Sequence, residues 1–337
     1  MAPLTKILSI LTASTIATSS IIQIPSTTSK PRTTSDDDDN DTPLPLIIWH
    51  GLGDNYAAEG LQSVATLAEE INPGTLTYII RLGADPSADR SATFFGNTTL
   101  QIEQVCADLA AHPILSTAPA VDALGFSQGG QLLRGYIERC NFPPVRSLVT
   151  FGSQHNGISE FQKCGSMDWL CKGAEGLLRS NTWSSFVQSR LVPAQYFRDP
   201  TQMEDYLLYS NFLADINNER ALKNQTYKEN LEKLERFVMY LFEDDETVIP
   251  KETGWFAEVN GTEVTQLKDR DIYTEDWIGL KTLDKKGALK FERTEGGHMS
   301  LSDELLEGVF KKYYGPYGRK FDTEDEEVLS YSWQQDL

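Results

Sequence analysis

Short apolar runs alternate with segments of helical periodicity along most of this chain, and this alternation limits the possible folds more than any other feature. The apolar runs at 46–49, 76–80, 120–126 and 145–151 are typical of buried strands. Between them, apolar residues recur three and four positions apart, as on one face of a helix. Strands that alternate with helices of this length form a parallel sheet with helices on both faces. The sequence therefore predicts an α/β fold with a mostly parallel central sheet.

The alternation is interrupted once, between about residues 155 and 235, where the spacing is mostly helical and no clear strand occurs. We expect a helical insertion there. Apolar runs at 237–242 and 289–291 resume the sheet, and a last helix is expected around 301–310. The folded domain is expected to span residues 46–318.

The two ends of the chain differ in composition from this domain. Residues 1–20 contain Lys6, a short apolar stretch and then small residues, the pattern of a secretory signal peptide. A disordered N-terminus or a transit peptide is the alternative. The apolar stretch is too short to span a bilayer, so no transmembrane segment is predicted. Residues 21–45, rich in Ser, Thr, Pro and Asp, and the acidic residues 319–337 are predicted to be disordered.

The charge of the chain argues against one class of partner. The net charge is −19, from 49 acidic residues against 30 Lys and Arg. Binding to phosphate backbones requires clustered basic residues, and the sequence contains no basic run. Nucleic acid is therefore not expected to be a partner.

Cysteines and glycosylation sequences both suit an oxidising compartment. The four cysteines are an even number, and closure of the shortest loop favours Cys164 with Cys171, which leaves Cys106 with Cys140. Four buried free thiols are the alternative. Without a Cys-X-X-Cys pair, a metal site is not expected. Four Asn-X-Ser/Thr sequences are glycosylation candidates, at Asn40, Asn97, Asn224 and Asn260.

The sharpest motif is Gly125-Phe126-Ser127-Gln128-Gly129, which follows an apolar strand and precedes a helix. A Gly-X-Ser-X-Gly sequence in this context is typical of a nucleophile elbow, where a strained turn lifts the serine hydroxyl clear of the sheet. An ordinary turn serine is the alternative. We predict that Ser127 is a nucleophile.

A serine hydroxyl needs a base, and His298 has the position that this chemistry requires. It lies between a late strand and the last helix, after the nucleophile in the order serine, acid, histidine. A surface histidine is the alternative. The orienting acid should follow the strand at 237–242, where several acidic residues crowd together. We choose Asp245, with Asp244 as a close rival.

Stabilising a tetrahedral oxyanion requires two backbone N–H donors. One is expected from the residue after the nucleophile, Gln128, and one from the loop that follows the first strand, at Leu52. Glycines on both sides of Leu52 allow its backbone to approach a reacting carbonyl. A plain tight turn is the alternative reading of this loop.

Five motifs occur in register between about Pro45 and Tyr314, and together they resemble the palmitoyl-protein thioesterase family. They are Trp49-His50-Gly51-Leu52-Gly53-Asp54, Gly125-Phe126-Ser127-Gln128-Gly129-Gly130, Gly152-Ser153-Gln154-His155-Asn156-Gly157, Phe212-Leu213-Ala214-Asp215-Ile216-Asn217 and Glu295-Gly296-Gly297-His298. Members are α/β-hydrolases, generally lysosomal, which cleave long fatty acyl thioesters from cysteines of lipid-modified proteins. The resemblance implies that fold and that activity here, without a metal or other cofactor.

The resemblance also places Asp245 on the family's catalytic aspartate. It implies that the partners are S-acylated proteins or peptides with a long-chain acyl group, and that the protein enters the secretory pathway, for the lysosome, the vacuole or the cell exterior. The chain departs from the family at three places. Leu52 stands where members have Met, Asn55 and Tyr56 replace an adjacent cysteine pair, and Gly297 replaces an acidic residue beside the histidine.

Two alternatives to a thioesterase remain open on the sequence alone. A secreted lipase or carboxylester esterase would use the same three residues on an oxygen ester, and a hydrolase fold without activity would bind lipid. A sixteen-carbon chain needs a long apolar groove, whose walls we expect from the insertion at 155–235. The candidates for these walls, for which packing in an ordinary core is the alternative, are Trp183, Phe186, Val187 and Leu191.

Overall fold

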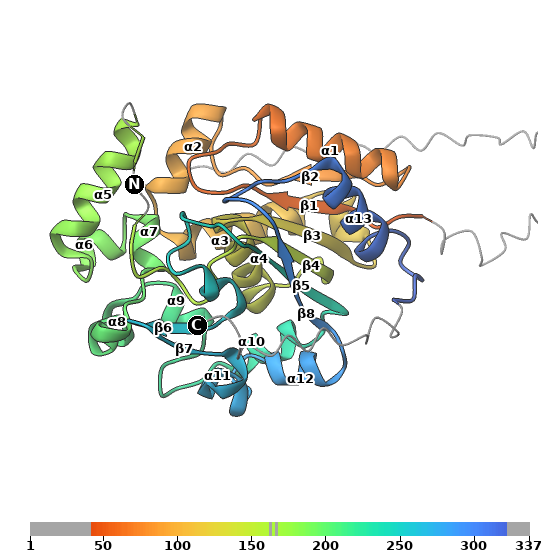
Figure 1. Ribbon diagram of the computed structural model, residues 1–337. Coiled ribbons are helices and arrows are strands. Elements are labelled where there is room, and N and C mark those ends of the chain that lie inside the picture. The colour runs from red at the N-terminus through yellow and green to blue at the C-terminus, as the bar shows by residue number, and fades with distance from the viewer. Residues whose placement is uncertain (1–41, 162–163, 166–167, 322–337) are drawn as a thin grey trace, which may run out of the picture. The chain divides into compact units, whose positions relative to one another are not determined.

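A six-stranded parallel sheet forms the centre of the computed structural model, which describes residues 42–161, 164–165 and 168–321 (Figure 1). The strand order is β2-β1-β3-β4-β5-β8, and each neighbouring pair is parallel, so all six carboxyl ends lie at one edge. The predicted α/β fold with a parallel sheet is thereby confirmed. The strands are β1 (Leu46–Trp49), β2 (Thr77–Ile79), β3 (Val121–Phe126), β4 (Val145–Phe151), β5 (Arg236–Phe242) and β8 (Leu289–Thr294).

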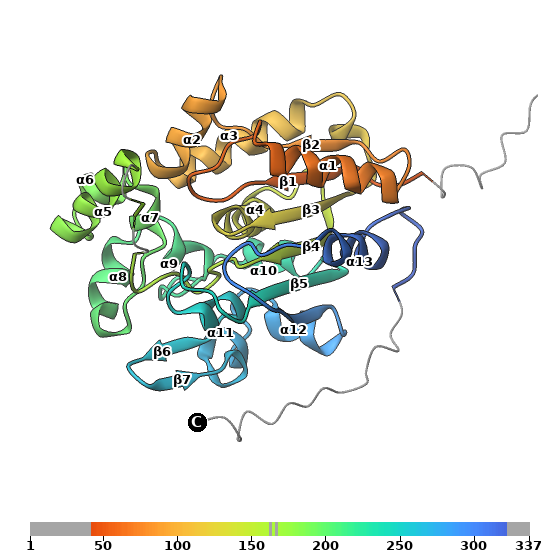
Figure 2. The ribbon, with the colours of Figure 1, turned by 45° about the horizontal axis from the view of Figure 1, so that its top comes forward.

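Helices cover both faces of this sheet because successive strand residues point to opposite sides. On one face, Leu46 and Ile48 pack with apolar residues of α1 and α13, and on the other, Ile47 and Trp49 pack with residues of α3 and α4. Figures 1 and 2 show α1 and α13 on the side of the sheet opposite to α10 and α12. The helices are α1 (Glu59–Ile71), α3 (Thr98–Ala111), α4 (Gln128–Arg139), α10 (Gln225–Leu231), α12 (Leu280–Lys285) and α13 (Asp303–Tyr313).

Between β4 and β5 the chain forms a series of mostly short helices. In Figure 2, α5 to α8 lie together at one end of the sheet. A third apolar cluster holds α5, α6 and α7, with Leu178 and Leu191 packed alongside Phe94. These helices are α5 (Trp169–Asn181), α6 (Ser185–Gln188), α7 (Val192–Gln195), α8 (Met203–Tyr209) and α9 (Leu213–Ile216). The domain boundaries themselves stay a prediction. The predicted signal sequence 1–20, most of the predicted linker 21–45 and most of the predicted tail 319–337 lie outside the described residues.

Helix α2 (Pro86–Phe94) was not expected from the sequence, because its nine residues include few apolar ones. Asp85 caps it by accepting hydrogen bonds from the Ser87 and Ala88 amides, and Pro86 occupies its first turn. This Asp-Pro pair is a helix start signal that could have revealed α2. Other short elements also escaped prediction, namely β6 (Glu258–Asn260), β7 (Glu263–Thr265), α11 (Asp271–Thr274), α12 and the 3₁₀ turns Leu115–Thr117, Lys251–Trp255 and Leu267–Asp269.

Both expected cysteine pairs are present as disulfides. Cys106–Cys140 joins α3 to the end of α4, and Cys164–Cys171 ties the first turn of α5 to the segment before it. Of the glycosylation candidates, Asn224 and Asn260 are exposed, Asn97 is half-buried as the cap of α3, and Asn40 lies outside the described residues. None of the helices in the described part of the chain has the length and apolar character needed to cross a bilayer.

Candidate active site

Ser127 stands at the sharp turn between β3 and α4. Its backbone has φ 49° and ψ −122°, a conformation that residues with side chains rarely adopt and that often marks functional sites. The flanking glycines are required because neighbouring backbone leaves no room for a side chain. A Cβ at Gly125 would lie 2.3 Å from the Gly130 Cα, and one at Gly129 would lie 2.2 Å from the Trp49 carbonyl oxygen. The motif thus occurs in the strand, turn and helix context that was predicted.

Three side chains from distant parts of the chain meet at this turn. The Nε2 atom of His298 lies 3.0 Å from the Ser127 Oγ, and its Nδ1 lies 2.7 Å from the Asp245 Oδ2. An ionised carboxylate can only accept, so Nδ1 carries the proton and Nε2 offers a lone pair to the Ser127 hydroxyl. The residues follow β3, β5 and β8, whose carboxyl ends lie at the same edge of the sheet. This is the hydrogen-bonded order of a serine, a base and an orienting acid.

Asp245 and its rival Asp244 have different surroundings. Asp245 is buried, and its Oδ1 accepts hydrogen bonds from the amides of Thr247 at 2.8 Å and Val248 at 2.9 Å. These two bonds hold the carboxylate with Oδ2 turned toward His298. Asp244 is exposed. Of the two residues, Asp245 is therefore the one that contacts the histidine.

The other three histidines have structural partners away from Ser127. The buried His50 bonds Asp89 through Nε2 at 2.8 Å, and the Nδ1 of His112 accepts from the Leu115 amide at 3.2 Å. His155 is fully buried, with Nε2 3.1 Å from the Thr150 hydroxyl. Burial, together with the nearby Arg134 guanidinium, holds the pKa of His155 well below its ordinary value. His298 is thus the histidine in reach of the Ser127 hydroxyl.

The amides of Leu52 and Gln128, the two predicted oxyanion donors, belong to segments that adjoin Ser127. Leu52 lies in the loop after β1 and Gln128 begins α4, and within the described residues neither amide donates a hydrogen bond. Gly51, beside Leu52, is so close to Ser127 that a Cβ there would lie 3.0 Å from the Ser127 Cβ. Two amides without acceptors beside a serine hydroxyl can stabilise a negative oxygen.

Helix α2 holds the loop that carries the Leu52 amide, and this support was not foreseen from the sequence. The fully buried Asp89 carboxylate accepts from His50 and from the Tyr56 amide, both at 2.8 Å, and from the Leu82 amide at 2.6 Å. Burial alone would raise the pKa of Asp89, but these hydrogen bonds lower it below its ordinary value, so the carboxylate stays ionised.

Thr93 of α2 holds both sides of the same site. Its hydroxyl accepts from the Gly53 amide at 2.9 Å, and its carbonyl oxygen accepts from the Gln128 side chain at 3.1 Å. The loop after β1 and the start of α4 are therefore fixed by one helix. An Asp or a Thr in a short polar segment carries no signal for this role.

A cavity of about 490 Å³ opens at Ser127 and His298, within the usual range for ligand pockets. It continues along α1 and the start of α13, where its lining is mostly apolar. Among the described residues, no group of three or more metal-ligating side chains occurs. The apolar lining residues are Leu52, Ala58, Leu61, Val64, Leu67, Phe126, Ile158, Phe161, Tyr196, Val248, Met299, Leu301 and Leu306.

The walls of this cavity differ from those expected. The insertion contributes Ile158, Phe161 and Tyr196, but none of the four candidates named from the sequence lines the cavity. Val187 and Leu191 are instead buried in the third apolar cluster, because their spacing serves helix packing. For the other two, Trp183 packs edge-on against the Phe197 and Tyr206 rings, and Phe186 is exposed to solvent. Most of the apolar wall comes from α1 and the segment leading into α13.

Comparison with known proteins places the chain beside several thioesterases. The family described as palmitoyl protein thioesterase matches residues 45–298. "Palmitoyl-protein thioesterase 1" of Caenorhabditis elegans is 36% identical over 278 residues, which cover 80% of this chain and 92% of that protein. "Palmitoyl-protein thioesterase 3" of Dictyostelium discoideum is 34% identical, with 80% and 89% covered. "Lysosomal thioesterase PPT2" of Homo sapiens is 28% identical, with 73% and 78% covered.

Proposed function

This chain belongs to the palmitoyl protein thioesterase family, and we propose that it hydrolyses long-chain fatty acyl thioesters on the cysteines of S-acylated proteins. The observation that carries the proposal is the hydrogen-bonded series Ser127, His298 and Asp245 at the mouth of an apolar cavity. That arrangement supplies a nucleophile, a base and room for an acyl chain in one place.

The first half of the proposed reaction forms an acyl-enzyme. The Ser127 Oγ attacks the thioester carbonyl while the Nε2 of His298 takes its proton. Asp245 stabilises the imidazolium that results, and the Leu52 and Gln128 amides donate to the oxyanion. The tetrahedral intermediate then collapses, the carbon–sulfur bond breaks, and His298 returns the proton to the departing cysteine thiolate.

The second half releases the fatty acid. Water takes the place of the thiol beside His298, which accepts a proton as the water oxygen attacks the acyl carbonyl. The same two amides stabilise the second oxyanion. Collapse breaks the bond to the Ser127 Oγ, and the proton on His298 returns to that oxygen. Apart from the substrate and the water, every group in this cycle is a side chain or backbone amide of this protein.

The experiment that tests this function compares two peptides that differ in one atom, one acylated on cysteine sulfur and the other on serine oxygen, both with a palmitoyl group. We expect the purified full chain to hydrolyse the thioester at least about tenfold faster by kcat/KM, a discrimination of roughly 1.4 kcal/mol. The two rates are measured as released fatty acid. A preference for the oxygen ester would replace the thioesterase with a lipase or carboxylester esterase.

The acyl chain is proposed to lie along α1. From Ala58 to Leu67 the helix rises about 14 Å at ~1.5 Å per residue, and both ends of this stretch line the cavity. Each buried CH₂ group contributes about 0.8 kcal/mol, so a longer chain gains binding energy along this wall. A preference for long chains follows from that length.

Replacing Leu67 with tryptophan is expected to shorten the acyl chain that the enzyme accepts. The larger ring would fill the far part of the cavity and displace about two methylene groups, which corresponds to roughly a tenfold rise in KM for a palmitoyl peptide. KM for a butyryl peptide should stay unchanged. Thr66→Trp is the matched control, because Thr66 is exposed on the same helix and does not line the cavity. An equal rise in KM for the palmitoyl and butyryl peptides would contradict the placement of the acyl chain along α1.

The proposed compartment is the lysosome or vacuole, reached through the secretory pathway. Relatives of this chain are named lysosomal thioesterases. The two disulfides are stable in an oxidising compartment, and the exposed Asn224 and Asn260 are accessible for glycosylation. The proposed signal sequence at 1–20 would provide entry to that pathway.

A further inference from the structure

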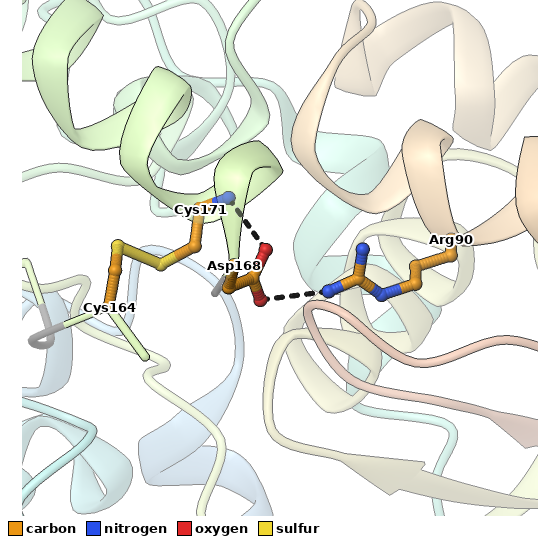
Figure 3. The surroundings of a disulfide bond; sticks show 4 residues. All are labelled: Arg90, Cys164, Asp168 and Cys171. Carbon is orange, nitrogen blue, oxygen red and sulfur yellow. Dashed lines mark hydrogen bonds and ion pairs between the residues drawn. A yellow bond between two sulfur atoms is a disulfide. The ribbon is translucent and has the colours of Figure 1, made fainter. Parts of the chain in front are cut away.

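Arg90 of α2 joins two segments that lie far apart in the sequence. Its Nε donates to the Gly53 carbonyl oxygen at 2.8 Å, and its Nη2 donates to the Asp168 Oδ2, also at 2.8 Å. Figure 3 shows the guanidinium reaching from α2 to the carboxylate at the start of α5. A guanidinium suits this place because its planar fork can serve two acceptors at once, which an ammonium on a flexible stem does less well.

The first acceptor belongs to the proposed oxyanion loop. Gly53 follows Leu52, and its amide already donates to the Thr93 hydroxyl at 2.9 Å. The backbone amide and carbonyl of Gly53 thus both hydrogen-bond to α2. The φ of Gly53 is 81°, a conformation that favours glycine. Holding Gly53 at both groups limits how far the neighbouring Leu52 amide can turn.

The second acceptor, Asp168, is fixed to α5 in two ways. Its Oδ1 caps the helix by accepting from the Cys171 amide at 3.1 Å, and Cys171 is bonded to Cys164 (Figure 3). Farther along, the buried Ala174 and Leu178 of α5 belong to the apolar cluster against which Leu52 packs. The same helix therefore shares an apolar cluster with Leu52 and is linked, through Asp168 and Arg90, to the backbone of the loop.

We propose that Arg90 is a positioning residue that links the position of α5 to the orientation of the Leu52 N–H group. It touches none of the proposed reacting atoms and acts through the Gly53 carbonyl. When α5 is in place, Asp168 holds the guanidinium where Nε meets Gly53; without Asp168 the guanidinium can turn away. The inference rests on the proposed function, because it takes the Leu52 amide as an oxyanion donor.

The test measures how fast a fluorophosphonate labels Ser127. In this probe reaction the serine oxygen bonds to phosphorus while His298 takes its proton, fluoride leaves, and the phosphoryl oxygen occupies the place of the oxyanion. Loss of an oxyanion donor costs about 10²–10³-fold in rate, so a donor that is only misdirected should cost about tenfold. We expect Arg90→Ala to lower the labelling rate constant, and kcat for both palmitoyl and butyryl thioesters, by about tenfold.

Three further variants separate positioning from simple loss of charge. Asp168→Asn keeps the helix cap, since Asn caps as well as Asp, and is expected to slow labelling about threefold. Arg190→Ala is the matched control: this exposed arginine stacks on Phe186 of α6 and should label at the wild-type rate. Arg90→Lys keeps the charge but not the planar fork, and we expect it to be labelled about threefold more slowly than wild type. It takes the place of Arg90→Ala if that variant folds poorly.

The outcomes distinguish this inference from the proposed function. Labelling of Arg90→Lys and Arg90→Ala within twofold of wild type would overturn the positioning role. A wild-type chain that is labelled and cleaves only oxygen esters would overturn the thioesterase function, while the ratio of labelling rates would still decide the role of Arg90. A wild-type chain that is not labelled at all would overturn both.

Discussion

Replacing Ser127 with alanine is expected to lower kcat for thioester hydrolysis by about 10⁴-fold or more. Loss of the nucleophile in serine hydrolases has effects of this size or larger, because the acyl-enzyme route disappears. The fold should survive, since alanine lacks only the Oγ atom and the Gly125 and Gly129 contacts around the turn remain. The measurement is fatty acid release from a palmitoyl-cysteine peptide, with thermal unfolding as a check on the fold.

A nearby serine provides the control for this substitution. Ser300 lies two residues from His298, is exposed and does not line the cavity. We expect Ser300→Ala to hydrolyse the peptide at the wild-type rate. If Ser127→Ala kept more than about a tenth of the activity, the nucleophile would have to be a different group.

Replacing Asp245 with asparagine is expected to lower kcat by about 10⁴-fold, as loss of the orienting carboxylate does in other serine hydrolases. The introduced amide could accept from the Thr247 and Val248 amides as the carboxylate does now, but it would not stabilise an imidazolium. It would also permit the tautomer of His298 that points a proton at Ser127. Rates of acyl release measured under saturating substrate report this change in kcat.

The adjacent aspartate is the control for Asp245. Asp244→Asn removes the same charge one residue away, from a side chain that is exposed. We expect its kcat to stay within about twofold of wild type. A comparable loss of kcat in the two variants would mean that the acidic loop acts through its total charge. The contact between Asp245 and His298 would then not be what orients the histidine.

The parts of the site that could be predicted are those with a local signal. Ser127 was identified from glycines two positions away and from the strand before it, and the structure shows why those glycines are needed. His298 followed from its place between a strand and the last helix. The choice between Asp244 and Asp245 could not be made from local signals, because both follow the same strand in the same acidic run. The amides of Thr247 and Val248 turn one carboxylate toward the histidine.

The parts that could not be predicted depend on contacts across the sequence. Asp89 meets His50 from 39 residues away, and Arg90 meets Asp168 from 78 residues away. Neither α2 residue stands in a motif, and the helix itself is too polar to show an apolar period. The walls of the cavity were misplaced for a related reason: helical spacing shows that a face is apolar but does not show what it packs against.

The sequence by itself determined the class of fold and singled out Ser127 and His298, because strand and helix periods and the glycine spacing around Ser127 are local properties of the chain. Only the tertiary structure decided which acid meets His298, which helices line the cavity and how α2 supports the Leu52 loop. Those features arise where side chains from separate strands and helices come within hydrogen-bond distance, and no local pattern records which distant partners will meet.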